Sequence, residues 1–230
     1  MFLPALGVTV AVAILCGLDR TAAGQFMICR PIVAAPLTGW LLGEVRIGLQ
    51  IGAMLELLWL GRLPVGAAIP PDDSQVAVGC TFLAVISHAQ TGLSPQAVAV
   101  ASLLVGMPFG KAGQLFDRLA RSANARLLTM AELALDSGRF DGLDNFHLRG
   151  IWHFAAASLA TLTVVVGGGM LCLPLFFKYL NGPLVSAAPW VYLLFPLVGI
   201  GSLLSGLRVP RAALLFVGSF ICGLLVLALR

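Results

Sequence analysis

Three acidic side chains stand in the otherwise apolar stretch 47–80, and they are the residues best placed to do chemistry. Glu56 lies in the middle of an apolar run, and Asp72 and Asp73 follow the two prolines at 70–71. Burying an ionised carboxylate in a bilayer costs free energy, so such residues are usually kept for a transport pathway or a binding site. The stretch is therefore predicted to carry the functional site.

Each carboxylate also has a structural alternative. Glu56 could pair with an arginine such as Arg62, or burial could hold it protonated. Asp72 could lie in a solvated turn or cap the helix that starts at SQVAVGCTF, and Asp73 is the better candidate for the solvated residue. The sequence favours function for Glu56 and leaves Asp72 open.

Two amides and one histidine extend this set. Gln25 and Gln50 could hydrogen-bond a sugar hydroxyl, or they could satisfy the end of a broken helix. His88 ends an apolar run beside Gln90 and is interpreted as an interfacial histidine.

Several classes of chemistry find no support in the sequence. It has no glycine-rich phosphate loop ending in Lys-Ser or Lys-Thr, no H-E-x-x-H and no G-x-S-x-G. The five cysteines have no CxxC spacing and are expected to be packing residues. Basic residues sit in loops and at span ends, so nucleic acid is not expected as a ligand. No catalytic residue, metal site or cofactor is predicted.

The composition places the chain in a membrane. Hydrophobic residues make up 59% of it and charged residues 10%, with a mean hydropathy of +0.99. Runs such as VAVAILCGL are apolar on every face, which favours helices over a β-barrel. Residues 2–18 lack the basic start of a cleaved signal and are interpreted as a retained span. The predicted fold class is all-α, a polytopic helical membrane protein.

Four apolar runs in the N-terminal half are short, at 31–43, 47–60, 76–88 and 96–110. At ~1.5 Å per residue the first reaches only about 20 Å, against a hydrocarbon core of ~30 Å. Prolines and glycines separate the runs, which predicts half-helices and re-entrant hairpins. The GxxxG spacings Gly39/Gly43, Gly48/Gly52 and Gly106/Gly110 would let helix backbones approach closely.

These patterns divide the chain into three parts. Residues 1–110 are predicted to form a membrane core with re-entrant segments and the substrate site. Residues 111–150 alternate basic and acidic side chains and are predicted to form one or two amphipathic helices on the cytoplasmic membrane surface. Residues 151–230 are expected to be a helical scaffold with three longer spans, at 151–177, 189–207 and 212–229, bent near Pro174.

Between Asp19 and Asp73 the motifs resemble a known family. They read D-x5-Q-x4-RP-x-VA-x-PL-x-G-x-LLGE, then G-x-x-x-G-x-x-LE-x-x-x-LG, then P-x-GAA-x-PPDD. This order resembles the IIC subunit of the mannose/fructose/sorbose family of the phosphoenolpyruvate-dependent sugar phosphotransferase system (PTS). The resemblance is strong over residues 18–92, and the rest of the chain agrees in layout.

The resemblance implies a sugar permease of the bacterial inner membrane. It would form an oligomeric complex with a IID membrane subunit, and a IIB subunit charged by IIA would phosphorylate a hexose-like sugar. Glu56 and Asp72 match acidic positions near the sugar path, and Asp19, Gln25 and Gln50 complete the candidate substrate-binding set. The family carries its phosphoryl groups on IIA and IIB, so no histidine of this chain is expected to carry one.

Two other functions remain open at this stage. The chain could be a non-transporting membrane anchor or assembly subunit that recruits cytoplasmic proteins through residues 111–150. It could also be an ion-coupled secondary carrier, because the sequence holds no nucleotide-driven engine.

Overall fold

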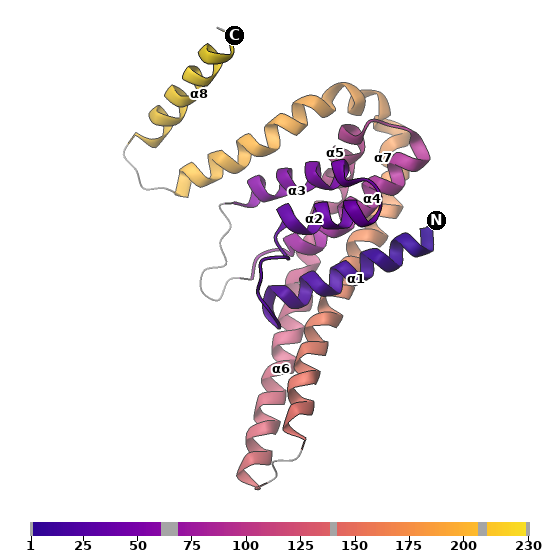
Figure 1. Ribbon diagram of the computed structural model, residues 1–230, viewed down its shortest axis with the longest axis vertical. Coiled ribbons are helices and arrows are strands. Elements are labelled where there is room, and N and C mark those ends of the chain that lie inside the picture. The colour runs from indigo at the N-terminus through magenta and orange to yellow at the C-terminus, as the bar shows by residue number, and fades with distance from the viewer. Residues whose placement is uncertain (1, 61–68, 139–141, 207–210, 229–230) are drawn as a thin grey trace.

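The computed structural model describes residues 2–60, 69–138, 142–206 and 211–228, and these ranges are helical apart from short turns and one longer connection (Figure 1). No strand occurs in them, which confirms the predicted all-α class. The elements in chain order are α1 (Phe2–Thr21), α2 (Pro31–Leu41), α3 (Val45–Trp59), α4 (Asp73–Thr91), α5 (Pro95–Gly106), the 3₁₀ helix η1 (Met107–Lys111), α6 (Ala112–Asp136), α7 (Leu143–Gly206) and α8 (Ala212–Ala228).

Several helices are long and apolar enough to cross a bilayer. In the described ranges, the stretches that meet both conditions are Phe2–Thr21, Pro95–Asp136, Leu143–Leu180 and Gly182–Gly201. This agrees with the polytopic architecture that the composition predicted.

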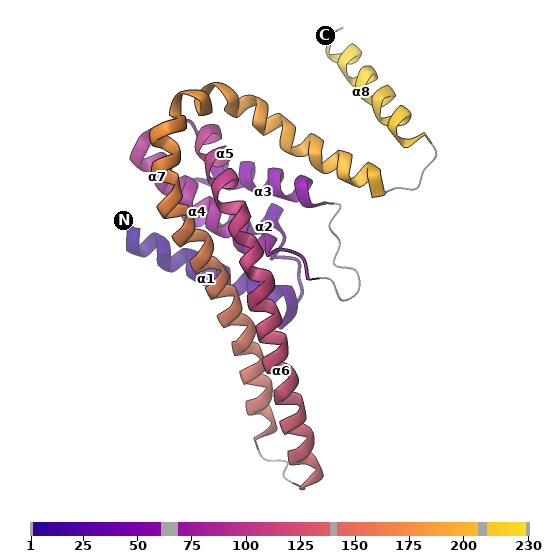
Figure 2. The same cartoon turned by 180° about the vertical axis from the view of Figure 1, so that it is seen from behind.

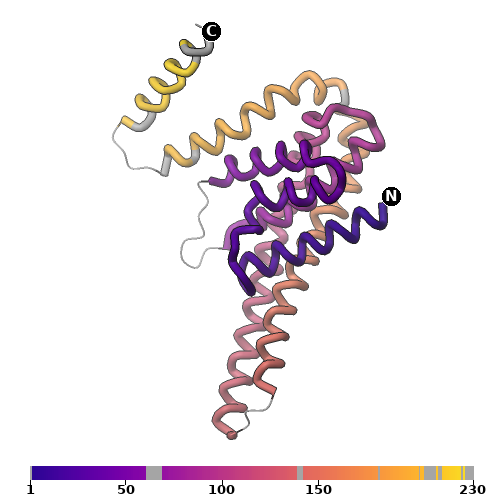
Figure 3. Tube along the Cα trace, viewed as in Figure 1, coloured from indigo at the N-terminus to yellow at the C-terminus, as the bar shows by residue number. Residues whose placement is uncertain are grey.

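Proline and glycine fix the ends of the short helices. Pro31 and Pro95 stand in the first turns of α2 and α5, where a missing N–H costs no helical hydrogen bond. Gly43, between α2 and α3, has a φ of +84°, and Gly92, after α4, has a φ of +66°. A residue with a Cβ adopts such angles poorly. The chain therefore turns sharply after α2 and after α4 (Figure 3).

The predicted short helices are only partly confirmed. Helices α2 and α3 have 11 and 15 residues, so each is shorter than the ~30 Å hydrocarbon core. The prediction for 76–88 was wrong, because α4 has 19 residues and begins at Asp73, where Asp72 caps it. The prediction for 96–110 was also wrong, because α5 continues through η1 into α6 as one stretch of 42 residues.

Helices α2 and α3 form a hairpin whose backbones lie in direct contact. A Cβ at Gly39 would collide with backbone atoms of Gly48, a Cβ at Gly48 with those of Ala35, and a Cβ at Gly52 with the carbonyl of Pro31. The close approach predicted from the GxxxG spacings is therefore confirmed at these three glycines. The fourth glycine of the two motifs, Gly43, serves the turn instead.

Helix α4 lies at the centre of the fold and contacts α1, α2, α3, α5 and α7. Its residues from Ser74 to Val85 are buried, including the polar Gln75. The Gln75 Nε2 donates a 2.9 Å hydrogen bond to the carbonyl of Ala13 in α1. This bond fixes the start of α4 against α1.

Helix α6 and the first part of α7 form an antiparallel pair, here called the arm, that extends away from the other helices (Figures 1 and 2). Within the arm, His153 Nδ1 lies 2.6 Å from Asn124 Oδ1. The amphipathic helix expected within 111–150 is present as α6, but it packs lengthwise on α7 instead of forming a segment of its own. The expected boundaries at 110/111 and 150/151 fall inside η1 and α7, and the three-part division stays a proposal.

Helix α7 runs without interruption over 64 residues. The spans predicted at 151–177 and 189–207 overlap two stretches that are long and apolar enough to cross a bilayer, Leu143–Leu180 and Gly182–Gly201, but the chain stays helical between them. Its four internal prolines, Pro174, Pro183, Pro189 and Pro196, remove hydrogen bonds without ending the helix. As prolines predict, α7 bends, and its later part returns beside α3 (Figures 1 and 2). Helix α8 agrees with the predicted span 212–229 as far as the described residues reach.

Candidate functional site

The last turn of α1 holds the chain that follows it. Asp19, in this last turn, is only 4% exposed. Its Oδ1 accepts a 2.6 Å hydrogen bond from the Phe26 N–H, and its Oδ2 accepts a 3.0 Å bond from the Cys29 N–H. Asp19 therefore binds the backbone of residues 22–30, here called the connector.

The connector has an unusual backbone. Gly24, Gln25 and Met27 have φ angles of +83°, +54° and +66°. Two of these residues carry a Cβ, for which this region is unfavourable. The Gln25 side chain is exposed, so the structure places it on the connector surface and in none of the ion pairs described below.

Asp72 caps the N-terminus of α4 and also forms an ion pair with Arg20. Its Oδ1 accepts hydrogen bonds from the Gln75 N–H (3.1 Å) and from the Ser74 hydroxyl (2.8 Å). The same oxygen lies 2.7 Å from Arg20 Nη1, and Asp73 Oδ1 lies 3.1 Å from that nitrogen. The capping alternative for Asp72 is thus correct, and the cap is combined with an ion pair. Asp73 is also paired, so the solvated-turn alternative for it was wrong.

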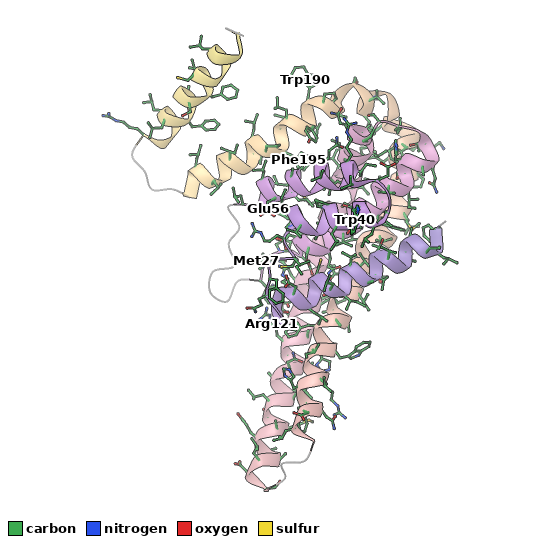
Figure 4. All side chains as sticks on the ribbon, viewed as in Figure 1. Met27, Trp40, Glu56, Arg121, Trp190 and Phe195 are labelled. Atoms are coloured by element: carbon green, nitrogen blue, oxygen red, sulfur yellow. The ribbon has the colours of Figure 1, made fainter. Side chains whose placement is uncertain are left out.

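Glu56 pairs with an arginine, as its structural alternative anticipated. The partner is Arg30, whose Nη2 contacts Glu56 Oε1, while Glu56 Oε2 accepts a 3.3 Å hydrogen bond from the Ile32 N–H. The Glu56 side chain is 15% exposed and that of Arg30 is 38% exposed. Arg62, the partner named from the sequence, lies outside the described residues. Figure 4 shows Glu56 near the end of α3.

The candidate carboxylates pair with two arginines that lie near the two ends of the connector. Arg20, just before the connector, holds Asp72 and Asp73, and Arg30, its last residue, holds Glu56. Within the described residues, Glu56 and Asp72 each have an arginine partner and make no hydrogen bond with each other. The two arginines were missed in the sequence, although a buried carboxylate signals a nearby cation and the RP pair stands in the first motif.

The remaining candidates lie apart from these ion pairs. The Gln50 Oε1 is buried and has no hydrogen-bond partner within the described part of the chain. The His88 Nδ1 lies 2.7 Å from the Leu93 carbonyl at the far end of α4, which suits a helix-end residue. In the ranges that the structure covers, no three His, Cys, Asp or Glu side chains gather closely enough to hold a metal ion.

Little open space remains beside Asp72. A cavity of about 20 Å³ is lined by both charged and small residues: Gly17, Arg20, Thr21, Ile69, Pro70, Asp72, Gly113, Asp117, Phe154, Ala157, Ser158 and Thr161. This volume holds about one water molecule. A ligand as large as a sugar therefore requires the surrounding elements to move.

The double role of Asp72 leads to a stability prediction. Asp72→Ala removes a helix cap, worth about 1 kcal/mol, and also leaves Arg20 without its closest partner. Ser94→Ala removes the cap of α5 and no ion pair, so it is the matched control. The melting temperature of the purified protein is expected to fall further for Asp72→Ala than for Ser94→Ala. Equal decreases would show that the contact between Arg20 and Asp72 adds nothing to stability.

The fold and the charged pairs define a class of protein. Multi-pass helical proteins that keep paired charges at the ends of interrupted helices are typically transport proteins. Residues 4–228 match the model of the family described as the sorbose-specific IIC component of the PTS. The chain belongs to this family, and the family predicted from its motifs is confirmed.

A curated relative agrees with this assignment. The mannose-specific EIIC component of the PTS of Escherichia coli (strain K12) is 28% identical over 142 residues, which cover 62% of this chain and 50% of the relative. The chain thus spans about half the length of the curated relatives it matches.

The solved structures share the fold. A chain described as a membrane protein has a TM-score of 0.71 at 21% identity, with 98% of this chain and 90% of that chain covered. A chain of the mannose transporter ManYZ in complex with microcin E492 (MceA) has a TM-score of 0.55 at 20% identity, with 95% and 85% covered. The family match and the long apolar helices confirm the predicted location, a multi-pass protein of the bacterial inner membrane.

Proposed function

We propose that this chain is the sugar permease (IIC) component of a mannose-type PTS and that it carries a hexose-like sugar across the inner membrane. One observation carries the proposal. Two sparsely exposed carboxylates, Glu56 and Asp72, stand at the end of α3 and the start of α4, and both are held by arginines within a chain of this family. The names of the family and of its mannose-specific relative support a hexose as the substrate.

The chemistry of these groups suits a polyhydroxylated ligand. Each carboxylate oxygen has two lone pairs, so Glu56 and Asp72 can accept sugar hydroxyls in addition to their present partners. The buried Gln50 Oε1 offers a further acceptor, and the exposed Gln25 amide offers donors at the connector surface. A neutral sugar can bind such a site without an opposing charge.

The proposed complex contains three other kinds of subunit. A IID subunit would complete the translocation unit in the membrane, and a IIB subunit charged by IIA would phosphorylate the sugar on the cytoplasmic side. This chain would carry no phosphoryl group. Large apolar side chains on the outside, such as Trp40 and Trp190 (Figure 4), support burial in lipid or against a membrane partner.

The proposal is tested by Glu56→Gln, which keeps the size of the side chain and removes its charge. Uptake of radiolabelled mannose or sorbose by cells is expected to fall about tenfold or more, because a hydrogen bond to a charged group contributes roughly 1.5–3 kcal/mol. Uptake is expressed per amount of folded protein in the membrane, because the change also removes the ion pair with Arg30. The control is Glu132→Gln, an exposed carboxylate on α6. Normal uptake by the Glu56→Gln variant would remove Glu56 from the site.

A further inference from the structure

Two arginines, one shortly before the connector and one at its end, contact the candidate sugar-binding carboxylates. Arg20 precedes the connector and contacts Asp72 and Asp73, and Arg30 ends it and contacts Glu56. These contacts span 52 and 26 positions of the chain, so they join elements that are distant in sequence. Arg20 is positioned by helix α1, to which it belongs, whereas the position of Arg30 depends on the shape of the connector.

Asp19 is the side chain that fixes this shape. Both of its carboxylate oxygens accept backbone N–H groups of the connector, from Phe26 at 2.6 Å and from Cys29 at 3.0 Å. Since the residue is 4% exposed, its oxygens face the connector backbone and not an open cavity. This geometry does not suit a direct contact with sugar, which the sequence had suggested for Asp19.

The connector needs such a restraint. Gln25 and Met27 hold positive φ angles, which residues with a Cβ adopt only where the surrounding structure over-determines them. Their side chains are exposed and provide little packing to hold the backbone. The hydrogen bonds from Phe26 and Cys29 to Asp19 flank Met27 on both sides, which identifies Asp19 as the restraint.

We propose that Asp19 is a positioning residue, which holds the connector so that Arg30 keeps Glu56 oriented for sugar hydroxyls. This inference rests on the proposed function. The guanidinium groups hold the carboxylates while no sugar is bound, and incoming hydroxyls take over part of that hydrogen bonding.

The first experiment measures the mobility of the connector with a spin label. Phe26, whose side chain is 78% exposed, is replaced by cysteine and carries a nitroxide spin label. The other accessible thiols, Cys29, Cys172 and Cys222, are changed to serine, while Cys16 and Cys80 stay because they are buried. Asp19→Asn is expected to narrow the spectral lines, because it replaces one of the two accepting oxygens with an NH₂ group, which cannot accept an N–H. The control Asp136→Asn, at the exposed end of α6, is expected to leave them unchanged.

The second measurement asks whether Asp19 acts through Glu56. Mannose binding to the full chain in membranes is compared for Asp19→Asn, Glu56→Gln and the double variant. Asp19→Asn alone is expected to weaken binding about tenfold, but by less than about twofold when Glu56 is already glutamine, because residues in one network are not additive. A general folding defect would instead multiply with the effect of Glu56→Gln.

The two possible failures are distinct. Unchanged label mobility in Asp19→Asn, or effects that multiply in the double variant, would overturn the positioning role. Normal mannose binding by Glu56→Gln would instead overturn the proposed sugar site, whatever the label shows.

Discussion

Gly48→Val is expected to remove most of the folded protein from the membrane. A Cβ at Gly48 would overlap the backbone of Ala35 and Pro36, and backbone atoms cannot rotate away as the end of a flexible side chain can. Helix α3 would have to separate from α2, which would also displace Glu56, about two turns further along α3, from Arg30. We expect a loss of about 3 kcal/mol, at the upper end for overpacked interiors.

Size-exclusion chromatography of a fluorescent fusion measures this loss as the fraction of monodisperse protein. Gly7→Val is the matched control, because a Cβ at Gly7 in α1 has no heavy atom within 4 Å. The control is expected to behave like the parent protein. If Gly48→Val were equally well tolerated, the direct backbone contact between α2 and α3 would not exist.

This hairpin was predictable because its cause is local. The glycines at four-residue spacing and the prolines that start and interrupt α2 are visible in the sequence, and each has one physical consequence. The continuation of α7 was not predictable in the same way. Lys178 and four prolines resemble a loop between spans, but kinked helices tolerate both when neighbouring helices pack around them.

The candidate site, too, could be predicted from the sequence only in part. Glu56 and Asp72 stand out because carboxylates are rare in apolar sequence, and both are sparsely exposed in the structure. Their partners could not be assigned, since Arg20 and Arg30 are 52 and 26 positions away from them in the sequence and meet them only in the folded chain. The role of Asp19 is hidden for the same reason. Its two hydrogen-bond donors are backbone groups, which every sequence contains.

Arg30→Glu is expected to have the second large effect, because it places a second carboxylate beside Glu56. Two like charges 4 Å apart repel by about 4 kcal/mol at an effective dielectric constant of ~20. Solvent reduces this value here, since the Arg30 side chain is 38% exposed. The folded fraction is still expected to fall several-fold. The neutral change Arg30→Gln removes the attraction without adding repulsion. The folded fraction of this variant is therefore expected to fall less than that of Arg30→Glu.

The charge swap Arg30→Glu with Glu56→Arg then separates the two roles of Glu56. It restores an attractive pair between the connector and α3, so the folded fraction is expected to recover to at least half of the parent value. Mannose uptake is expected to stay low, because the carboxylate now stands on the connector and a guanidinium occupies its place on α3. Recovery of uptake together with folding would mean that Glu56 acts only as the partner of Arg30. A swap that fails to restore folding would mean that the pair does not hold α3 to the connector.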